Sequence, residues 1–185
     1  MNRKATDRSN ASEHEPGHYG VSPAPLEWRL HAFDQLDLRQ LYAVLAARIA
    51  VFVVEQDCPY QDLDGLDDLA LHLVGWGDDG SVVAYARILP PGTRFEQPSI
   101  GRVLTSLGGR RSGLGRELMR RAIDVIGERH PGCPIRISAQ CYLERFYCEL
   151  GFAVDSAPYE EDGIAHVEMQ LPAEAAGSAG RGMAD

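Results

Sequence analysis

The sequence predicts a mixed α/β domain of the α+β kind, in which helices flank one central sheet. Segments whose apolar and polar residues alternate, as in strands, are interspersed with segments that repeat apolar residues at helical spacing. The composition is that of an ordinary folded protein, because 44% of the residues are hydrophobic and 24% are charged. With 185 residues, the chain has the length of one domain with flanking segments.

The two ends of the chain differ from its middle. Residues 1–25 are polar and interrupted by glycine and proline, and residues 172–185 are rich in alanine and glycine. Neither end has a periodic apolar pattern, so we expect a disordered N-terminal arm and a flexible C-terminal tail. The folded domain is therefore expected over residues 26–171, which is long enough to bury one core.

The first half of this domain is expected to hold four strands and one helix. Alternating apolar residues predict a strand near 26–30. Asp37 begins a capping box, and apolar residues at helical spacing extend the following helix over 38–52. An acidic loop comes next. The three further strands are expected at 69–76, 82–89 and 99–105.

The second half adds two helices and three strands. A helix is expected over 113–129, since apolar residues recur on one face until prolines end it. A shorter helix follows at 143–150, with Gly151 as its C-terminal cap. The strands are expected at 135–139, 152–154 and 164–171. The predicted order of elements is βαβββαβαββ.

The chain as a whole is acidic, with a net charge of −9 from 27 acids against 18 bases. Nucleic-acid-binding proteins usually present a basic surface, so the total argues against that class. No apolar run approaches the roughly 18 residues of a membrane span, and no apolar stretch near the N-terminus resembles a secretory signal. We therefore expect a cytoplasmic protein without a nucleic-acid or membrane partner.

The cysteines do not form a recognisable motif. No two of them have the C-x2-C spacing of zinc or thioredoxin sites. We expect no metal, and reduced thiols that serve as small buried side chains. A nucleophilic or redox role is the alternative. The four are Cys58, Cys133, Cys141 and Cys148.

The segment from Arg110 to Arg116 is rich in glycine and arginine and lies between a predicted strand and a predicted helix. Free N–H groups and the dipole at a helix N-terminus favour an anion, and glycine lets the backbone approach phosphate oxygens. A P-loop would need Gly-Lys-Ser/Thr, and a dinucleotide fingerprint would need glycine where Leu118 stands. We interpret the segment as a phosphate-binding loop. A glycine-rich turn with a solvated basic edge is the alternative.

Arginine is concentrated around this loop. Six of the 17 arginines fall within 20 residues, where Glu117 is the only acid. The guanidinium group suits phosphate, so an anionic ligand explains why an acidic chain has one basic segment. The six are Arg102, Arg110, Arg111, Arg116, Arg120 and Arg121.

Two motifs in succession resemble those of the GNAT N-acetyltransferases. A strand from Ser99, then Arg110-x-x-Gly113-x-Gly115 and a helix, is similar to the family's motif A. The segment 144–152, Glu-Arg-Phe-Tyr-Cys-Glu-Leu-Gly-Phe, is similar to motif B. The resemblance implies a single GNAT-type domain with a twisted, mostly antiparallel central sheet.

The resemblance covers essentially the whole of residues 26–171. Three segments look like the ElaA subgroup in particular, a subgroup defined by sequence more than by a known substrate. They are residues 51–62, 84–89 and 159–166.

The resemblance also implies roles for individual residues. The backbone of Val103, Leu104 and Thr105 would hydrogen-bond the pantetheine arm of acetyl-CoA and polarise the thioester carbonyl. Tyr147 would protonate the departing CoA thiolate. Gln140 is a further candidate for lining the CoA channel. The pyrophosphate would be held by the loop residues Arg110, Arg111, Ser112, Gly113, Leu114, Gly115 and Arg116.

Outside the resemblance, some of these residues have simpler readings. Val103 and Leu104 also fit plain core strand residues, and Tyr147 fits a core aromatic. Two positions depart from the family pattern: Leu107 replaces a common proline, and Arg111 replaces a common glycine. Arginine is accommodated at position 111 if its φ is negative, and on that condition we expect CoA binding to survive.

Transfer of an acetyl group to an amine needs a base to accept a proton. We place Glu55 and His166 in the catalytic set, because Glu55 follows the first helix near the expected cleft and His166 alternates with apolar residues on the last strand. Each has an alternative role: Glu55 in an ion pair with an arginine, and His166 as a satisfied sheet residue. The other candidates are His72, Glu160 and Glu161.

The segment from Glu55 to Asp79 contains eight acids and no lysine or arginine. An acidic loop of this kind is commonly a solvated surface. Its alternative function is to steer a cationic amine toward the acceptor cleft.

The resemblance therefore implies an acetyl-CoA-dependent N-acetyltransferase without a metal. It would acetylate the primary amine of a small molecule, or of a peptide, by direct transfer. One alternative is a CoA-binding sensor without turnover. Another is an acyltransferase of the homoserine-lactone-synthase type, because Arg48-x-x-Val-Phe52-x-x-Glu55 looks like that group's opening motif. A monomer and a homodimer are both compatible with the sequence.

Overall fold

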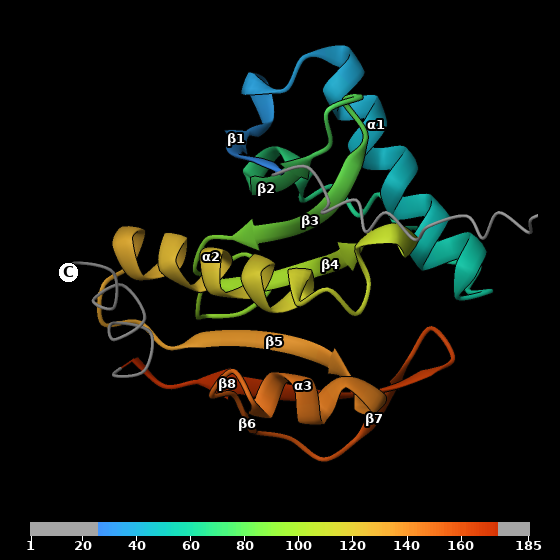
Figure 1. The fold of residues 1–185 in the computed structure, drawn as a ribbon. Helices are drawn as coiled ribbons and strands as arrows, with labels where there is room; N and C mark the ends of the chain where they lie inside the picture. Colours follow the sequence, from blue (N-terminus) through green and yellow to red (C-terminus); the bar gives the residue numbers. More distant parts are fainter. Residues whose placement is uncertain (1–25, 174–185) are drawn as a thin grey trace, which may run out of the picture.

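An eight-stranded sheet organises the protein, with helices against both of its faces (Figure 1). The computed structural model describes residues 26–173. The strands are β1 (Glu27–Ala32), β2 (Leu71–Trp76), β3 (Val82–Leu89), β4 (Ser99–Thr105), β5 (Ile135–Gln140), β6 (Ala153–Val154), β7 (Tyr159–Glu161) and β8 (Ile164–Leu171). The helices are α1 (Leu38–Arg48), α2 (Leu114–Arg129) and α3 (Glu144–Cys148).

The strands follow the order β1-β2-β3-β4-β5-β8-β6, and β7 pairs with β8. Every pair is antiparallel except β4 with β5. The prediction of a mixed α/β domain around one mostly antiparallel sheet is therefore confirmed. The predicted N-terminal arm and C-terminal tail lie outside the described residues, apart from the first two residues of the tail.

The larger of two hydrophobic cores lies between the sheet and α2. Leu114, Leu118, Ala122 and Ile126 repeat at four-residue intervals, so one face of α2 is continuously apolar and buried. Tyr147 of α3 belongs to the same core. Burial of this stripe positions the N-terminus of α2 at the end of β4.

The second core lies on the opposite face of the sheet, under α1. Val44 of α1 packs with Tyr85 of β3 and Leu104 of β4. Alternate residues of β3 serve the two cores, since Ala84 and Ala86 face α2. The Asp37 carboxylate caps α1 by accepting from the backbone N–H groups of Arg39 and Gln40, as the capping box predicts.

Two elements differ from the prediction. The first helix continues beyond residue 52, but from Ile49 to Glu55 its turns widen into a π-helix. The strand β7 was not predicted. It is joined to β8 by Asp162 and Gly163, whose φ angles are both positive (52° and 80°), and an Asp-Gly pair is a strong hairpin signal.

The sheet opens between β4 and β5, its one parallel pair. Only Ser99 and Arg136 are paired across it, with the Arg136 N–H donating to the Pro98 carbonyl at 3.0 Å. The two ribbons then diverge toward their C-terminal ends (Figure 1). From Gly101 to Thr105, the edge of β4 that faces β5 has no strand partner among the described residues.

Candidate active site

A cleft of about 610 Å³ occupies the opening between β4 and β5. One wall is the outer edge of β4, and a second is formed by the end of the π-helix with the loop that follows it. The third wall comes from β5, α3 and the β7–β8 hairpin. The cleft therefore joins the two halves of the sheet, and residues far apart in sequence face one another across it.

The edge of β4 offers backbone groups to this cleft. Leu104 is buried in the α1 core, and Val103 packs against the α2 core. Their side chains are thus plain core residues, as the simpler reading had it, while their backbone lies along the unpaired edge. Strand alternation turns the backbone groups of Leu104 toward β3 and those of Val103 and Thr105 toward the cleft, where they suit an extended, amide-containing ligand.

The loop after β4 leads directly into the N-terminus of α2. Gly113 caps the helix with a φ of 87°, a conformation that glycine adopts without strain. The first backbone bonds of the helix are donated by Arg116 and Glu117, both to the Gly113 carbonyl. The N–H groups that precede Arg116 lie ahead of this ladder, which is the arrangement that binds anions.

The side chains of the loop hold its shape. The Ser112 hydroxyl donates to the Gly109 carbonyl at 2.7 Å. Leu114 is buried, and a Cβ at Gly109 would approach its Cδ2 to 2.7 Å, so the turn closes tightly only with glycine there. Leu114 can therefore offer a ligand only its backbone groups, and Ser112 can offer its backbone groups or its hydroxyl.

Arg111 does not have the negative φ that we expected. Its φ is 63°, in the left-handed region, where a residue other than glycine costs about 1–2 kcal/mol. The expectation that arginine fits here without strain was wrong. Its side chain is exposed beside the helix N-terminus.

The arginines around the loop are mostly paired with acids. Arg110 makes two hydrogen bonds of 2.7 Å to the carboxylate of Glu55, and Arg102 binds Asp62. Arg116 pairs with Glu149, and Arg121 pairs with Glu117 one turn away. Among the described residues, only Arg111 and Arg120 of this group lack an ion pair, so the basic face is weaker than a residue count indicates.

Tyr147 lies at the foot of the cleft. Its ring packs edge-on against Phe146 and Phe152, with centroids 5.0 and 6.0 Å away. Tyr147 is only 6% exposed, yet it lines the cleft. Burial raises the pKa of Tyr147 to about 12, so the phenol stays protonated at neutral pH and is available as a proton donor.

Glu55 and His72 are poorly placed to accept a proton. Hydrogen bonds from Arg110 lower the pKa of Glu55 below its ordinary value. His72 is fully buried, and its ring nitrogens are occupied by the Tyr85 hydroxyl and the Asp67 carbonyl, both at 2.9 Å. His72 is the satisfied sheet residue of the simpler reading and does not line the cleft.

His166 lines the cleft and has one ring nitrogen available. Its Nδ1 lies 2.8 Å from the Ile164 carbonyl, which can only accept, so Nδ1 carries the hydrogen and Nε2 keeps its lone pair. The ring stacks on Tyr159 at a centroid distance of 6.1 Å, and this contact fixes its orientation. This arrangement suits a general base.

The other two acids differ from each other. Glu160 is exposed outside the cleft. Glu161 lines it and accepts hydrogen bonds from Arg94 at 2.6 Å and from the Ser138 hydroxyl at 3.1 Å. Burial alone would raise the pKa of Glu161, but the Arg94 guanidinium holds it below its ordinary value.

Several cleft residues were not singled out in the sequence. Gln56 at the end of the π-helix accepts a hydrogen bond from Gln140 of β5 at 3.1 Å, and this contact bridges the two halves of the sheet. Cys58 is buried beside the cleft, with its thiol donating to the Asp162 carbonyl. No local pattern marks Gln56, since its partner is 84 positions away.

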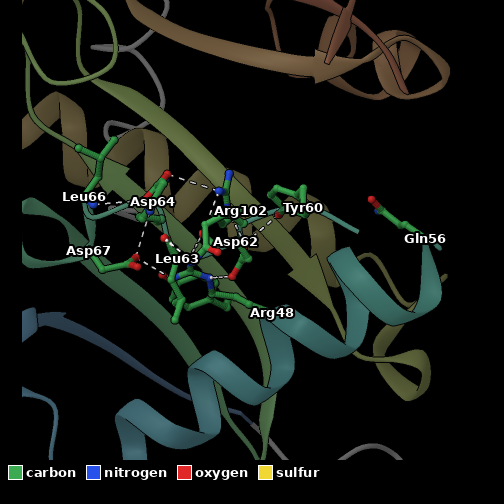
Figure 2. Close-up of polar contacts among 12 residues, drawn as sticks. Arg48, Gln56, Tyr60, Asp62, Leu63, Asp64, Leu66, Asp67 and Arg102 are labelled. Atoms are coloured by element: carbon green, nitrogen blue, oxygen red, sulfur yellow. Dashed lines mark hydrogen bonds and ion pairs between the residues drawn. The ribbon is translucent and has the colours of Figure 1, made fainter. Parts of the chain in front are cut away.

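The acidic segment is only partly a solvated surface. Asp62, Asp64 and Asp67 all bind arginines of the sheet or of α1 (Figure 2). Burial would raise the pKa of Asp64, but hydrogen bonds and charges from Arg87 and Arg102 lower it to about 2. Together with Glu55, which is paired with Arg110, four of the eight acids therefore contribute little net field for steering a cation.

Residues 26–173 contain neither a candidate metal site nor a candidate membrane-spanning helix. No group of three or more histidine, cysteine or acidic side chains there has the geometry to hold a metal ion. None of the helices in this part of the chain is both long and apolar enough to cross a membrane.

Comparison with known proteins adds the following. The sequence profile of the acetyltransferase (GNAT) domain family matches residues 43–173. Protein ElaA of Escherichia coli is 44% identical over 147 residues, which cover 78% of this chain and 95% of ElaA. A UPF0039 protein of Synechocystis is 42% identical over 144 residues, covering 78% of this chain and 94% of the relative.

Solved structures agree with these matches. An acyl-CoA N-acyltransferase from Pseudomonas aeruginosa superposes with a TM-score of 0.75 at 41% identity, covering 79% of this chain and 99% of that one. The crystal structure of Escherichia coli ElaA superposes with a TM-score of 0.73 at 42% identity and the same coverage.

Proposed function

The chain belongs to the GNAT acetyltransferase family, on its ElaA-like branch, and on that basis we propose that it transfers an acetyl group from acetyl-CoA to the primary amine of a small molecule. One observation carries the proposal. An unpaired strand edge and a protonated buried tyrosine line one cleft, and the loop that leads from that strand to the N-terminus of α2 borders the cleft at Arg110.

The donor would lie along β4 and reach the N-terminus of α2. The unpaired backbone groups of Val103 and Thr105 fit the amides of a pantetheine arm, and the N–H groups ahead of Arg116 fit a pyrophosphate. Arg110 and Arg116 lie beside that helix terminus, although each is paired with a carboxylate, Glu55 and Glu149 respectively. A phosphate that binds either arginine would therefore take the place of the carboxylate now paired with it.

The reaction is proposed as direct transfer. The amine lone pair attacks the thioester carbonyl carbon, and an N–H of the β4 edge stabilises the negative charge on the carbonyl oxygen. As the C–S bond breaks, the Tyr147 hydroxyl donates its proton to the thiolate. The proton lost by the amine passes to Nε2 of His166, directly or through water.

The acceptor is proposed to be a small amine without several positive charges. Four acids and four arginines line the cleft, so its charges balance and give no preference for a polycation. The acids are Glu55, Asp64, Glu161 and Asp162, and the arginines are Arg87, Arg94, Arg102 and Arg110.

The test is release of free CoA from acetyl-CoA in the presence of a panel of amines, with products identified by mass spectrometry. We expect turnover with a primary amine of low charge, and an acetylated amine as product. Tight acetyl-CoA binding with no turnover on any amine would instead make the protein a CoA-binding sensor. A lactone product would place it with the homoserine-lactone synthases.

A further inference from the structure

Six charged side chains close into a ring of alternating sign on the α1 face of the sheet. Helix α1, strand β3 and strand β4 each contribute an arginine, and the loop after the π-helix contributes three aspartates (Figure 2). We call it the charge ring. Its pairs are Arg48–Asp62 (2.9 Å), Asp62–Arg102 (2.7 Å), Arg102–Asp64 (3.4 Å), Asp64–Arg87 (2.6 Å), Arg87–Asp67 (3.1 Å) and Asp67–Arg48 (2.6 Å).

The ring is largely buried and has no net charge. The side chains of Arg48 and Arg87 are at most 2% exposed, and that of Asp62 is 3% exposed. Each member binds two of opposite sign, so no charge in it is left unpaired. Buried ion pairs stabilise a fold little compared with apolar packing. The main effect of the charge ring is therefore on the geometry of the segments that it joins, and not on stability.

That geometry is unusual at Arg102. Between the pairs Arg87↔Gly101 and Tyr85↔Leu104, strand β4 has two residues where β3 has one, so β4 contains a β-bulge. Arg102 is the first bulge residue and has a φ of 51°, a conformation usually given to glycine. The neighbouring Gly101 does not have a positive φ, so the strained conformation falls on the arginine and not on the glycine. A Cβ at Gly101 would meet nothing within 4 Å.

The charge ring holds this strained residue through its side chain. The Arg102 guanidinium donates to the Asp62 carboxylate at 2.7 Å and to the Asp62 carbonyl at 3.1 Å. Figure 2 shows the guanidinium turned toward Asp62 and Asp64, with Arg48 reaching Asp62 from the other side. Backbone strain of this kind persists only where surrounding contacts determine it.

The bulge lies where β4 separates from β5 at the cleft. Before it, Ser99 makes the one pairing between β4 and β5, and after it, residues 103–105 form the unpaired edge. A bulge bends its strand and increases the twist, so Arg102 controls the direction in which this edge leaves β5.

The other side of the charge ring shapes the second wall of the cleft. Tyr60 donates its hydroxyl hydrogen to the Asp62 carboxylate at 2.8 Å, and its ring lies under the Arg102 guanidinium at 5.5 Å. Tyr60, Gln61 and Asp64 all line the cleft. The same contacts thus locate the strand edge and the facing loop.

We propose that Arg102 is a positioning residue, which the charge ring uses to fix the β4 bulge and to hold the donor-binding edge and the acceptor-side loop in one relative geometry. The inference rests on the proposed function for its catalytic consequence, since it concerns how the two substrates are aligned. It does not make Arg102 a proton donor or acceptor.

Two substitutions of the full-length protein test it. Asp62→Asn removes the charge that joins Arg48 to Arg102 and leaves the sequence of β4 unchanged. Arg102→Gly removes the side chain and supplies the residue best suited to a φ of 51°, so its fold is not strained by the change. Asp78→Asn, an exposed acid of the β2–β3 turn, is the matched control for charge.

We expect both variants to bind desulfo-CoA about tenfold more weakly by calorimetry, and to exchange the amide hydrogens of Leu104 and Ser106, which face β3, about tenfold faster. Once an amine that the protein acetylates is identified, its KM and the KM for the acetyl donor should rise together. The reason is that the charge ring contacts both walls of the cleft. The control should match the wild type in all of these measurements.

Wild-type affinity and wild-type exchange in both variants would overturn the proposal. A rise in KM for one substrate alone would also overturn it, since the ring would then not couple the two walls. If the wild-type protein binds no CoA derivative, the proposed function fails. The exchange of the Leu104 and Ser106 amides in the variants then still decides whether the charge ring holds the bulge.

Discussion

At the scale of single residues, the cleft assigns different chemistry to groups that look alike in the sequence. Tyr147 is buried among aromatic rings, and burial keeps its phenol protonated. His166 has its Nδ1 hydrogen held by a carbonyl, and His72 has both nitrogens occupied. The difference between the two histidines is one of hydrogen-bond partners, and it makes His166 the better base.

Replacing Tyr147 with phenylalanine should lower kcat about 100-fold, because a general acid contributes about 10²–10⁴-fold. The ring contacts with Phe146 and Phe152 are retained, so the melting temperature and the affinity for CoA should stay close to wild type. Steady-state kinetics and thermal unfolding measure these effects. An unchanged kcat would remove Tyr147 from the mechanism.

Replacing His166 with glutamine should lower kcat about 100-fold, because no base remains to accept the proton of the amine. Glu55→Gln is the matched comparison. Its carboxylate is paired with Arg110, so we expect it to change the KM for acetyl-CoA more than kcat. The reverse pattern would identify Glu55 as the base.

At the scale of elements, the junction of β4 with α2 combines a left-handed glycine with a helix N-terminus. Gly113 ends the loop with a φ of 87°, and the first helical bonds converge on its carbonyl. The apolar stripe of α2 holds this end of the helix against the sheet. The loop therefore needs little reorganisation to receive an anion.

Gly113→Ala tests this junction. A Cβ there meets nothing within 4 Å, so the cost is backbone strain alone, about 1 kcal/mol. We expect that loss in chemical denaturation together with about fivefold weaker CoA binding. Gly80→Ala is the control, since it has a similar φ (77°) and equally open space in the distant β2–β3 turn. It should lose similar stability and bind CoA normally.

At the scale of the whole molecule, two half-sheets meet at a single residue pair and are braced around the cleft by side chains. Gln56 and Gln140 connect the halves across the opening. The ion pair of Arg94 with Glu161 connects the β3–β4 loop to the β7–β8 hairpin. The charge ring anchors the irregular loop that completes the α1 side.

The ring predicts a particular acid sensitivity. The pKa of Asp64 is lowered to about 2. Burial would raise the pKa of Asp67, but the Arg48 and Arg87 guanidinium groups outweigh burial and lower it. A carboxylate with a lowered folded-state pKa stabilises the fold above its unfolded value of about 3.9, and this stability is lost as pH falls toward the folded value. With allowance for solvent screening, Asp64 should contribute on the order of 1 kcal/mol.

Urea unfolding between pH 6 and pH 2 measures this contribution. The wild type should lose stability mainly between about pH 4 and pH 2. Asp64→Asn should be less stable at pH 6, by on the order of 2 kcal/mol, because Arg87 loses its bidentate partner. Its further loss in acid should be smaller. An identical pH dependence in both proteins would contradict this account of the ring.

Much of the fold follows from local patterns. The capping box at Asp37 and the four-residue apolar repeat of α2 predict their helices, because both signals act within one or two turns. The Arg110-x-x-Gly113-x-Gly115 motif likewise marks the loop at the helix N-terminus. The strand β7 was within reach as well, since Asp162-Gly163 is a strong local hairpin signal.

By itself, the sequence determined the domain class, the order of most elements and the glycine-rich loop, because each depends on neighbours along the chain. Only the tertiary structure decided the pairing of Glu55 with Arg110, the saturation of His72, the left-handed φ of Arg111 and the charge ring. These depend on contacts between residues 5 to 55 positions apart, or on backbone geometry imposed by them. A run of acids and a cluster of arginines look like two separate surfaces in the sequence, but folding brings several of them together and cancels their charge.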